Sequence, residues 1–200
     1  MTPTIRLART EDAGQIQAIY APIVSSTVIS FELEPPTVEE MHQRILTTLQ
    51  KYPWLVCERD REILGYAYAS EHRTRAAYQW CVDVSVYVNG RIRRAGIGRA
   101  LYISLLKILR VQGFYNAYAG ITLPNPASVG LHDSLGFTPI GVYRSVGYKL
   151  GKWHDVGWWH LALKEPSANP ELPVGLNKAQ KDPEWESALA AGVVHSNALS

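Results

Sequence analysis

Residues 80–110, WCVDVSVYVNGRIRRAGIGRALYISLLKILR, place an apolar strand, a glycine-containing turn and an amphipathic helix in direct succession. The apolar run at residues 80–88 predicts a strand, and apolar residues at helical spacing predict a helix at residues 97–111. Gly96 and Gly98 lie between them, where glycine lets the backbone approach a ligand closely. Because the free amides and positive dipole end of the helix attract anions, the turn is a candidate pyrophosphate site. On spacing alone, glycines that serve packing are an equally good interpretation.

The chain as a whole has the length and composition of one globular domain. Its 200 residues are 46% hydrophobic, which is enough for one well-buried core. A formal net charge of +2 favours neither a nucleic-acid-binding protein nor a membrane-surface protein. Because we see no signal-peptide core and no apolar run long enough to cross a bilayer, we expect a cytoplasmic protein.

Hydrophobic periodicity predicts further strands and helices before and after this central segment. We predict strands at residues 5–7, 54–57, 63–69, 114–121, 140–148 and 155–163. We predict helices that contain residues 16–23, that run from a capping box at Thr37 and Glu40 to about residue 51, and that cover residues 128–135. The resulting order, β-α-α-β-β-β-α-β-α-β-β, is typical of an α+β domain.

The composition changes after residue 164. Four prolines interrupt residues 165–200, and apolar periodicity there is weak. We therefore predict one domain at residues 1–164, followed by a C-terminal tail at residues 165–200. The tail is expected to be disordered or to hold one weak helix near residues 184–191.

The glycine turn and a later segment carry two motifs. These are Arg93-x-x-Gly96-x-Gly98 and Asn125-x-x-Ser128-x-x-x-His132-x-x-x-Gly136-Phe137. They resemble the acetyl-CoA signature and the N-x-x-A-x-x-x-Y-x-x-x-G-F segment of the GNAT acetyltransferases. The order of elements is similar to theirs as well. The resemblance implies an α+β GNAT fold, with a mixed, mostly antiparallel central sheet that is splayed between its two middle strands and flanked by helices.

Several short segments narrow the resemblance to the phosphinothricin and methionine sulfoximine N-acetyltransferases. They lie at residues 84–88, 123–125, 128–132, 146–149 and 151–157, within a similarity that covers about residues 4–164. This resemblance implies acetyl transfer from acetyl-CoA to the α-amino group of a small amino-acid-like substrate, such as phosphinothricin, methionine sulfoximine or methionine sulfone. It also implies a homodimer and a link to herbicide resistance.

The same resemblance assigns the residues that hold acetyl-CoA, which acts as cosubstrate. Backbone groups of Val86, Tyr87 and Val88 would pair with the pantetheine arm in the manner of an added strand. The pyrophosphate would lie on the turn Arg93-Arg94-Ala95-Gly96-Ile97-Gly98-Arg99. Asn125 would hold the pantetheine or the phosphate end, with Ser128 nearby. Core packing remains an alternative role for Val86 and Val88.

Two residues are candidates for acid–base catalysis. Asp83 lies in an otherwise apolar strand, where a carboxylate is costly unless it is hydrogen-bonded or hydrated, so it is a candidate general base. The matched position in the family branch holds Glu, and the shorter Asp makes a bridging water more necessary. A carboxylate that caps a turn or bulge is the alternative. His132 is a candidate acid toward the CoA thiolate or a second base, and a helix histidine packed near the surface is its alternative. We expect His72 at the surface.

Five residues are candidates for substrate binding. Arg73 and Arg75 precede the catalytic strand and offer the bidentate grip that suits a carboxylate. Phe31 and Glu32 resemble the substrate-lid residues of the branch, and Ser85 lies in the catalytic strand. Solvation at the surface is the alternative for Arg73.

Three other interpretations remain open. The fold could acetylate a protein N-terminus, a polyamine or an aminoglycoside, although a loop with two arginines favours an anionic small substrate. The chain could instead be a non-catalytic acetyl-CoA-binding regulatory module. The arginines near the glycine turn could bind nucleic acid, but they form no basic face, so we expect no nucleic-acid partner and no membrane partner. No metal is implied, because no His, Cys and Asp residues show ligand spacing.

Overall fold

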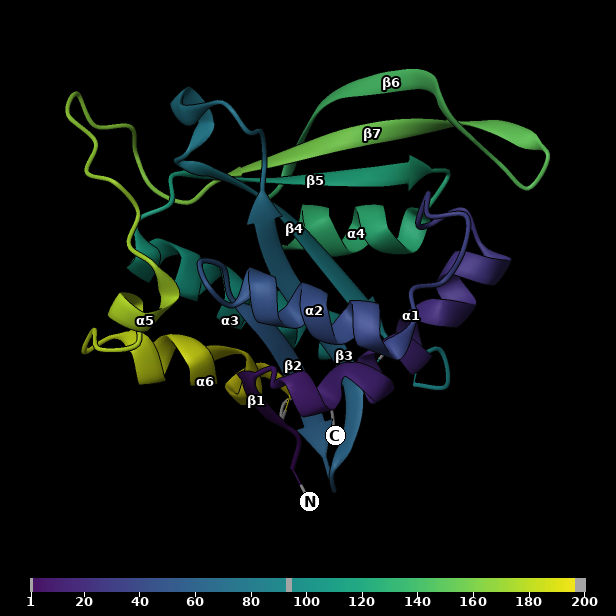
Figure 1. Ribbon diagram of the computed structural model, residues 1–200. Coiled ribbons are helices and arrows are strands. Elements are labelled where there is room, and N and C mark those ends of the chain that lie inside the picture. Colours follow the sequence, from purple (N-terminus) through teal and green to yellow (C-terminus); the bar gives the residue numbers. More distant parts are fainter. Residues whose placement is uncertain (1, 93–94, 197–200) are drawn as a thin grey trace.

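The computed structural model describes residues 2–92 and 95–196, which form one seven-stranded sheet with helices on both faces (Figure 1). The strands are β1 (Thr4–Leu7), β2 (Trp54–Arg59), β3 (Glu62–Glu71), β4 (Cys81–Val88), β5 (Asn116–Leu123), β6 (Thr138–Lys149) and β7 (Lys152–Ala162). The helices are α1 (Ala13–Ser26), α2 (Val38–Thr48), α3 (Ile97–Gln112), α4 (Pro126–Ser134), α5 (Leu176–Ala179) and α6 (Trp185–Ser196), with 3-10 turns η1 (Thr10–Asp12) and η2 (Ala76–Tyr78).

The strand order across the sheet is β1-β2-β3-β4-β5-β7-β6. Strands β4 and β5 pair in parallel, and the other neighbouring pairs are antiparallel. The parallel pair requires a crossover, which α3 provides. This arrangement confirms the predicted α+β fold with a mixed, mostly antiparallel sheet.

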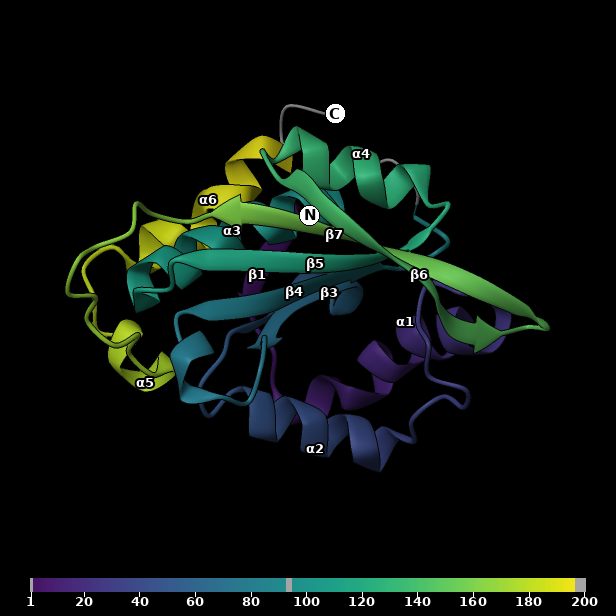
Figure 2. The ribbon, with the colours of Figure 1, turned by 90° about the horizontal axis from the view of Figure 1, so that it is seen from above.

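The helices form two layers around the sheet, as Figure 2 shows. Helices α1 and α2 cover one face, and α3, α4 and α6 lie on the other. Side chains alternate between the faces along each strand, so β2 contributes to two cores. Leu55 and Cys57 join the cluster around α3, whereas Trp54 and Val56 join the cluster around α1 and α2. Strands β2 and β3 are therefore buried on both faces over most of their length, which explains their nearly continuous apolar sequence.

Helix α2 begins at the predicted capping box. The Thr37 hydroxyl accepts a hydrogen bond from the Glu40 amide at 3.1 Å, and the Glu40 carboxylate accepts one from the Thr37 amide at 2.7 Å. Two amides that a helix start leaves unpaired are thus satisfied. The helix ends at Thr48, a few residues before the expected end near residue 51.

The sheet opens between its two middle strands. The ladder between β4 and β5 joins residues 81–83 to residues 116–118, and its last pair is Asp83 with Tyr118. Beyond that pair, β4 continues alongside β3 as far as Val88, while β5 continues alongside β7 as far as Leu123. Within the described residues, the facing edges of β4 and β5 therefore have no ladder partners past Asp83.

The segment expected to form a tail contains two helices, α5 and α6. Helix α6 packs along α3, and Ser104 of α3 joins them by two hydrogen bonds. Its hydroxyl donates to the Leu189 carbonyl at 2.7 Å and accepts from the Gly192 amide at 3.0 Å. Trp185 and Ala188 extend the core cluster around α3. The division of the chain at residue 164 remains a prediction, but α6 covers a face of α3 that would otherwise be exposed.

Candidate active site

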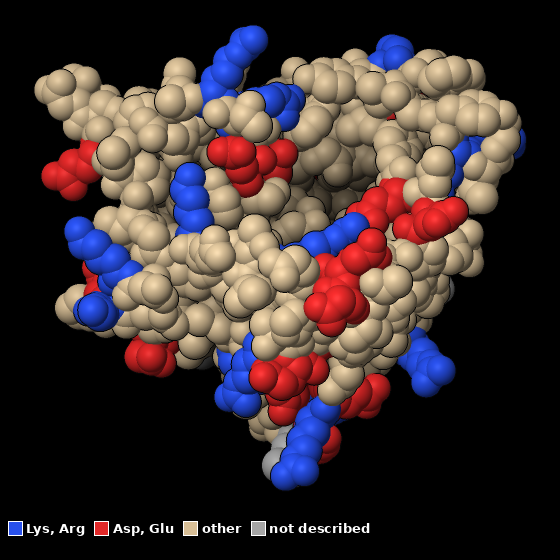
Figure 3. Space-filling view, in the orientation of Figure 1, with Lys and Arg blue, Asp and Glu red and all other residues tan. Residues whose placement is uncertain are grey.

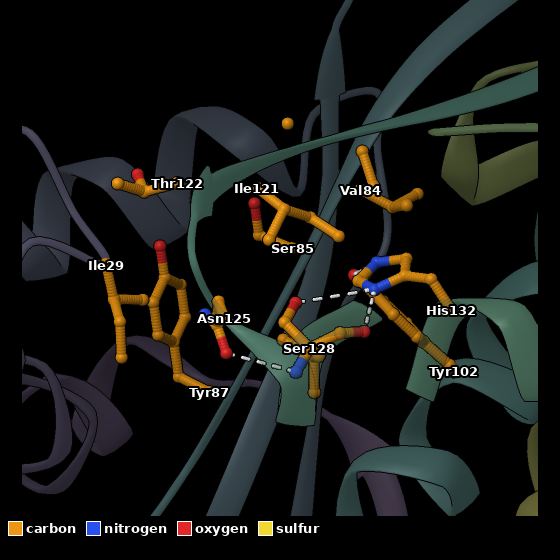
Figure 4. Close-up of a pocket in the computed structure, with 13 residues that line it drawn as sticks. Ile29, Val84, Ser85, Tyr87, Tyr102, Ile121, Thr122, Asn125, Ser128 and His132 are labelled. Atoms are coloured by element: carbon orange, nitrogen blue, oxygen red, sulfur yellow. Dashed lines mark hydrogen bonds between the residues drawn. The ribbon is translucent and has the colours of Figure 1, made fainter. Parts of the chain in front are cut away.

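A cavity fills the opening between β4 and β5 (Figure 4). Its walls come from β4, β5, α3, α4 and the loop after α1. The lining residues are Ile29, Val84, Ser85, Val86, Tyr87, Tyr102, Ala119, Gly120, Ile121, Thr122, Asn125, Ser128 and His132. Six of the residues expected at the site therefore meet in one place: Ser85, Val86, Tyr87, Asn125, Ser128 and His132.

His132 lies on α4 with 3% of its surface exposed. Its Nδ1 is 2.8 Å from the Ser128 carbonyl oxygen, and its Nε2 is 3.2 Å from the Tyr102 hydroxyl (Figure 4). Because a carbonyl can only accept, Nδ1 carries the proton, and in the neutral ring Nε2 accepts from Tyr102. Burial lowers the pKa of His132 and outweighs the opposing hydrogen bond to Ser128. The site thus holds a neutral imidazole with a fixed tautomer.

Tyr102 is a site residue that the sequence analysis missed. It lies on α3, is almost completely buried, and has a hydroxyl pKa raised by burial, so it remains a donor at neutral pH. Its position among the apolar residues of α3 favoured a purely packing role. The signal that could have identified Tyr102 is its hydroxyl on the buried face of the predicted helix, because a buried hydroxyl requires a hydrogen-bond partner.

Asp83 is the last β4 residue paired with β5, so it stands at the mouth of the opening. Its neighbours Val82 and Val84 face α3, so Asp83 points to the opposite face of the sheet. Asp83 and His132 therefore flank the opening from different faces and do not contact each other in any hydrogen bond of the described residues. Burial raises the pKa of Asp83, while a hydrogen bond from His72 opposes this effect.

The prediction that His72 lies at the surface was wrong. Its Nδ1 is 2.7 Å from Asp83 Oδ1, and 12% of its side chain is exposed. The reason is the β3–β4 register, in which Ser70 lies opposite Asp83, so the residue two places later folds back over the carboxylate. Tyr118 on β5 completes this cluster by stacking on the His72 ring at 4.4 Å.

The glycine turn has the backbone expected of an anion site at the start of α3. Gly96 is the N-cap, with a left-handed φ of 70° that other residues adopt at a cost. A Cβ at Gly98 would lie 3.4 Å from a Leu131 methyl group, which is ordinary van der Waals contact, so packing of α3 on α4 does not by itself require glycine there. The Arg99 guanidinium donates to the Ser134 carbonyl at 2.9 Å and is thus engaged with α4. Arg93 and Arg94 lie outside the described residues.

The other cofactor candidates take part in local structure as well. The Asn125 side chain caps α4 by accepting from the Ser128 amide at 3.1 Å. Val88 lies outside the cavity and packs against the core around α3. Ala95 and Ile97 flank Gly96, and the Ile97 side chain is buried in the same core.

The candidates for substrate binding lie around the cavity rather than in its lining, except for Ser85. The Glu32 carboxylate accepts two hydrogen bonds from Arg44, at 2.8 and 3.0 Å, and one from Tyr20 at 2.9 Å. Burial opposes ionisation of Glu32, but these bonds outweigh it and lower the pKa. Glu32 thus fixes the loop after α1, and the Phe31 ring in that loop lies 6.3 Å from the ring of His154.

The two arginines lie between β3 and β4. Arg73 donates to the His72 carbonyl at 2.7 Å, and its guanidinium carbon lies 5.7 Å from the ring centre of Trp158. Arg75 is the N-cap of η2 and is exposed. The Arg73 guanidinium is therefore accessible on the side of the sheet that His72 occupies, and Arg75 is exposed in the same loop.

The surface and the remaining side chains place few further constraints on function. Acidic and basic groups are interspersed around a hollow on the face shown in Figure 3. In the part of the chain that the structure describes, no group of three or more His, Cys, Asp or Glu side chains is arranged to hold a metal ion. No described helix is long and apolar enough to span a membrane.

Comparison with known proteins decides the family. Residues 5–158 match the family described as acetyltransferase (GNAT) domain. The chain belongs to the GNAT acetyltransferase family. The match confirms the GNAT fold and the N-acetyltransferase class that the two sequence motifs predicted.

Individual GNAT relatives support the predicted branch. The chain is 40% identical to a phosphinothricin N-acetyltransferase of Streptomyces viridochromogenes, over 85% of this chain and 92% of that protein. It is 34% identical to an L-methionine sulfoximine/L-methionine sulfone acetyltransferase of Salmonella typhimurium, over 82% of this chain and 97% of that protein. A phosphinothricin acetyltransferase from Sinorhizobium meliloti, solved in complex with acetyl-CoA, superposes with a TM-score of 0.80 at 36% identity, over 87% of this chain and 94% of that one.

Proposed function

We propose that this protein transfers the acetyl group of acetyl-CoA to the α-amino group of a small amino-acid-like substrate, such as phosphinothricin, methionine sulfoximine or methionine sulfone. The opening between β4 and β5 carries the proposal, because it joins a free strand edge to a cavity that His132 lines, with Asp83 at its mouth. The substrates named for the relatives agree with it. We place the reaction in the cytoplasm.

The chain fits acetyl-CoA in two respects. The edge of β4 past Asp83 leaves backbone groups for the amide-containing pantetheine arm, as in strand addition. The start of α3, with Gly96 in a left-handed conformation, offers free amides to a pyrophosphate. Acetyl-CoA supplies the activated acyl group, while the chain orients the amine and moves protons. The backbone amide of Val86 is the candidate donor to the developing oxyanion, because the register directs the amides of Ser85 and Tyr87 toward β3.

The side chains suggest a division of the proton transfers. An amino acid's ammonium group must lose a proton before it attacks, and Asp83 stands where the opening begins. Its raised pKa, caused by burial, brings the carboxylate closer to the operating range of a general base. His132 is neutral and presents Nε2 to Tyr102, so it suits the role of second base or relay better than that of an acid.

The charge near Asp83 favours an anionic substrate. Arg73 lies beside it and Arg75 is exposed two positions later in the same loop, so both are candidates to grip a carboxylate, whereas the carboxylate of Glu32 is already bound by Arg44. A polyamine or an aminoglycoside would require free carboxylates in this region. The structure therefore gives more support to an amino-acid-like acceptor than to a polycation.

Release of CoA, followed with a thiol reagent, tests this proposal. The acceptors are methionine sulfoximine, phosphinothricin, methionine sulfone, spermidine, kanamycin and a peptide with a free N-terminus. We expect turnover with the first three only. Arg75→Ala should raise KM for these substrates at least about tenfold, whereas Arg59→Ala, an exposed arginine at the opposite end of the sheet, should not.

Other results would redirect the assignment. Turnover confined to spermidine, kanamycin or the peptide would contradict the substrate and retain the enzyme class. Binding of acetyl-CoA without turnover of any acceptor would favour the regulatory module.

A homodimer through β6 is part of the proposal. Strand β6 lies at the end of the sheet order and is exposed along most of its length. Large apolar side chains are exposed on β6, β7 and their connection: Ile140, Val142, Tyr143, Val146, Tyr148, Leu150 and Trp153. A long apolar edge strand requires a cover in a stable protein, and a second copy provides one.

Light scattering after size exclusion tests the dimer. Trp153 is 65% exposed and Leu172, outside the β6–β7 region, is 61% exposed, so they form a matched pair. We expect a dimeric wild type, dissociation in Trp153→Glu, and an intact dimer in Leu172→Glu. A monomeric wild type would contradict this part of the proposal.

A further inference from the structure

The carboxylate of Asp83 has a partner that its proposed role as a base does not require. His72 Nδ1 and Asp83 Oδ1 are 2.7 Å apart, with 12% and 27% of the two side chains exposed. An oxygen of an ionised carboxylate can only accept, so Nδ1 carries the shared proton. That assignment leaves Nε2 of the neutral ring with a free lone pair.

Aromatic side chains fix the plane of the His72 ring. Tyr118 stacks on it at 4.4 Å with an angle of 18° between the planes. Tyr78 and Trp158 meet it edge-on, at 6.0 and 6.3 Å. Tyr118 also lies directly opposite Asp83 in the β4–β5 ladder. This one tyrosine therefore contacts the His72 ring and is the ladder partner of Asp83.

The ring reaches open space on its other side. His72 lines a cavity of about 270 Å³, together with Arg73, Tyr118 and Trp158 on the arginine-bearing side of the sheet. The cavity has room for water and for polar ligand atoms. The pair therefore lies between the mouth of the β4–β5 opening and a cavity large enough for water, which β6 residues also line.

We propose that His72 and Asp83 form an imidazole–carboxylate pair that accepts the proton lost by the substrate's α-ammonium group. The inference rests on the proposed function and assigns the base within it. One N–H bond of the ammonium breaks and its electron pair becomes the nucleophile. The proton passes through water to His72 Nε2, while Nδ1–H remains donated to Asp83. The imidazolium then returns the proton to solvent. Asp83 orients the ring and stabilises its charged form, as an acid partner of a catalytic histidine does.

The other titratable groups around the pair do not compete for this proton. Arg73 beside it is cationic and favours the ionised carboxylate. Cys81 on β4, Tyr68 on β3 and Tyr118 on β5 face Asp83, and burial raises the pKa of each. They remain neutral near pH 7. Among the described residues that interact with Asp83, the imidazole is thus the group suited to exchange a proton there.

Two substitutions separate proton acceptance from simple positioning. His72→Phe keeps a ring on Tyr118 but removes both nitrogens. His72→Asn places an amide donor near the position of Nδ1, so it can retain the contact with Asp83 but cannot accept a proton. His160→Phe is the matched control, because His160 also contacts the Tyr118 ring, at 5.0 Å, and bonds to Asn116 rather than to Asp83.

We expect both His72 variants to lose about 100-fold or more in kcat/KM for methionine sulfoximine, with acetyl-CoA affinity retained. His160→Phe should stay within about threefold of wild type. The pH at which kcat/KM reaches half of its plateau should fall by about one unit or more in His72→Phe, because a carboxylate alone then serves as base. A loss of packing alone would not move this midpoint.

Activity near wild type in His72→Phe would overturn the proposal. Activity near wild type in His72→Asn would also overturn it, because the pair would then only position Asp83. If wild type turns over no amine, the proposed function fails, and nitrogen NMR of the imidazole decides the inference separately. A ring protonated at Nδ1 in the neutral form supports the pair, and one protonated at Nε2 refutes it.

Discussion

The contact between α6 and α3 yields a sharp prediction about Gly192. A Cβ atom added there would overlap the Ala100 carbonyl oxygen and lie 2.6 Å from the Ala100 carbonyl carbon and 2.9 Å from Ile5 Cδ1. Real Cβ atoms essentially never approach within 3.0 Å of such atoms. Because the Ala100 atoms belong to the backbone of α3, they cannot rotate away, and α6 must shift instead.

The size of the effect follows from three terms. Replacing a helical glycine by alanine favours folding by about 0.5–1 kcal/mol. Overpacking a close contact costs about 1–3 kcal/mol. Moving α6 also weakens its two hydrogen bonds with Ser104, at about 0.5–1.5 kcal/mol each. Gly192→Ala should therefore lower the free energy of unfolding by about 2–3 kcal/mol, or Tm by about 5–10 °C for a chain of this size.

Gly14→Ala is the matched control, because Gly14 is also helical but a Cβ atom added to it would have nothing within 4 Å. Gly14→Ala should leave the free energy of unfolding unchanged or raise it, whereas Gly192→Ala should lower it. Urea denaturation followed by circular dichroism measures both. A Gly192→Ala protein as stable as wild type would refute the packing of α6 on α3, and with it the view that residues 185–192 belong to the folded domain.

Three further predictions concern the site. Tyr102→Phe leaves His132 Nε2 buried without its donor and should lower the free energy of unfolding by about 1–3 kcal/mol, which urea denaturation against wild type measures. Because burial lowers the pKa of His132, the unfolded chain binds the extra proton first. Stability should thus decline as pH falls below about 6.5, and His132→Phe should flatten this decline in denaturation series between pH 5 and 8. Lys149 donates to the carbonyls of Val24 and Ser30, at 2.6 and 2.8 Å. Lys149→Met should loosen the loop after α1, and initial rates should show a KM for the amine raised about tenfold with little change in kcat.

Local sequence was enough to establish the elements and the family. Hydrophobic period, the Thr37–Glu40 capping box and the glycine turn each depend on residues close together in the chain, so local physics fixes them. The two motifs added the GNAT fold and, by resemblance, the cavity residues on β4 and α4. For residues 184–191 the sequence left disorder and a weak helix as alternatives, and it gave no indication that a helix there packs on α3.

The meeting of particular side chains depended on the folded chain. The pairing of His72 with Asp83 requires the register between β3 and β4, and the pairing of Tyr102 with His132 requires the packing of α4 against α3. These partners are 11 and 30 positions apart in the chain. Neither pair has a local signal, because a hydrogen bond between side chains of different elements exists only once both backbones are in place.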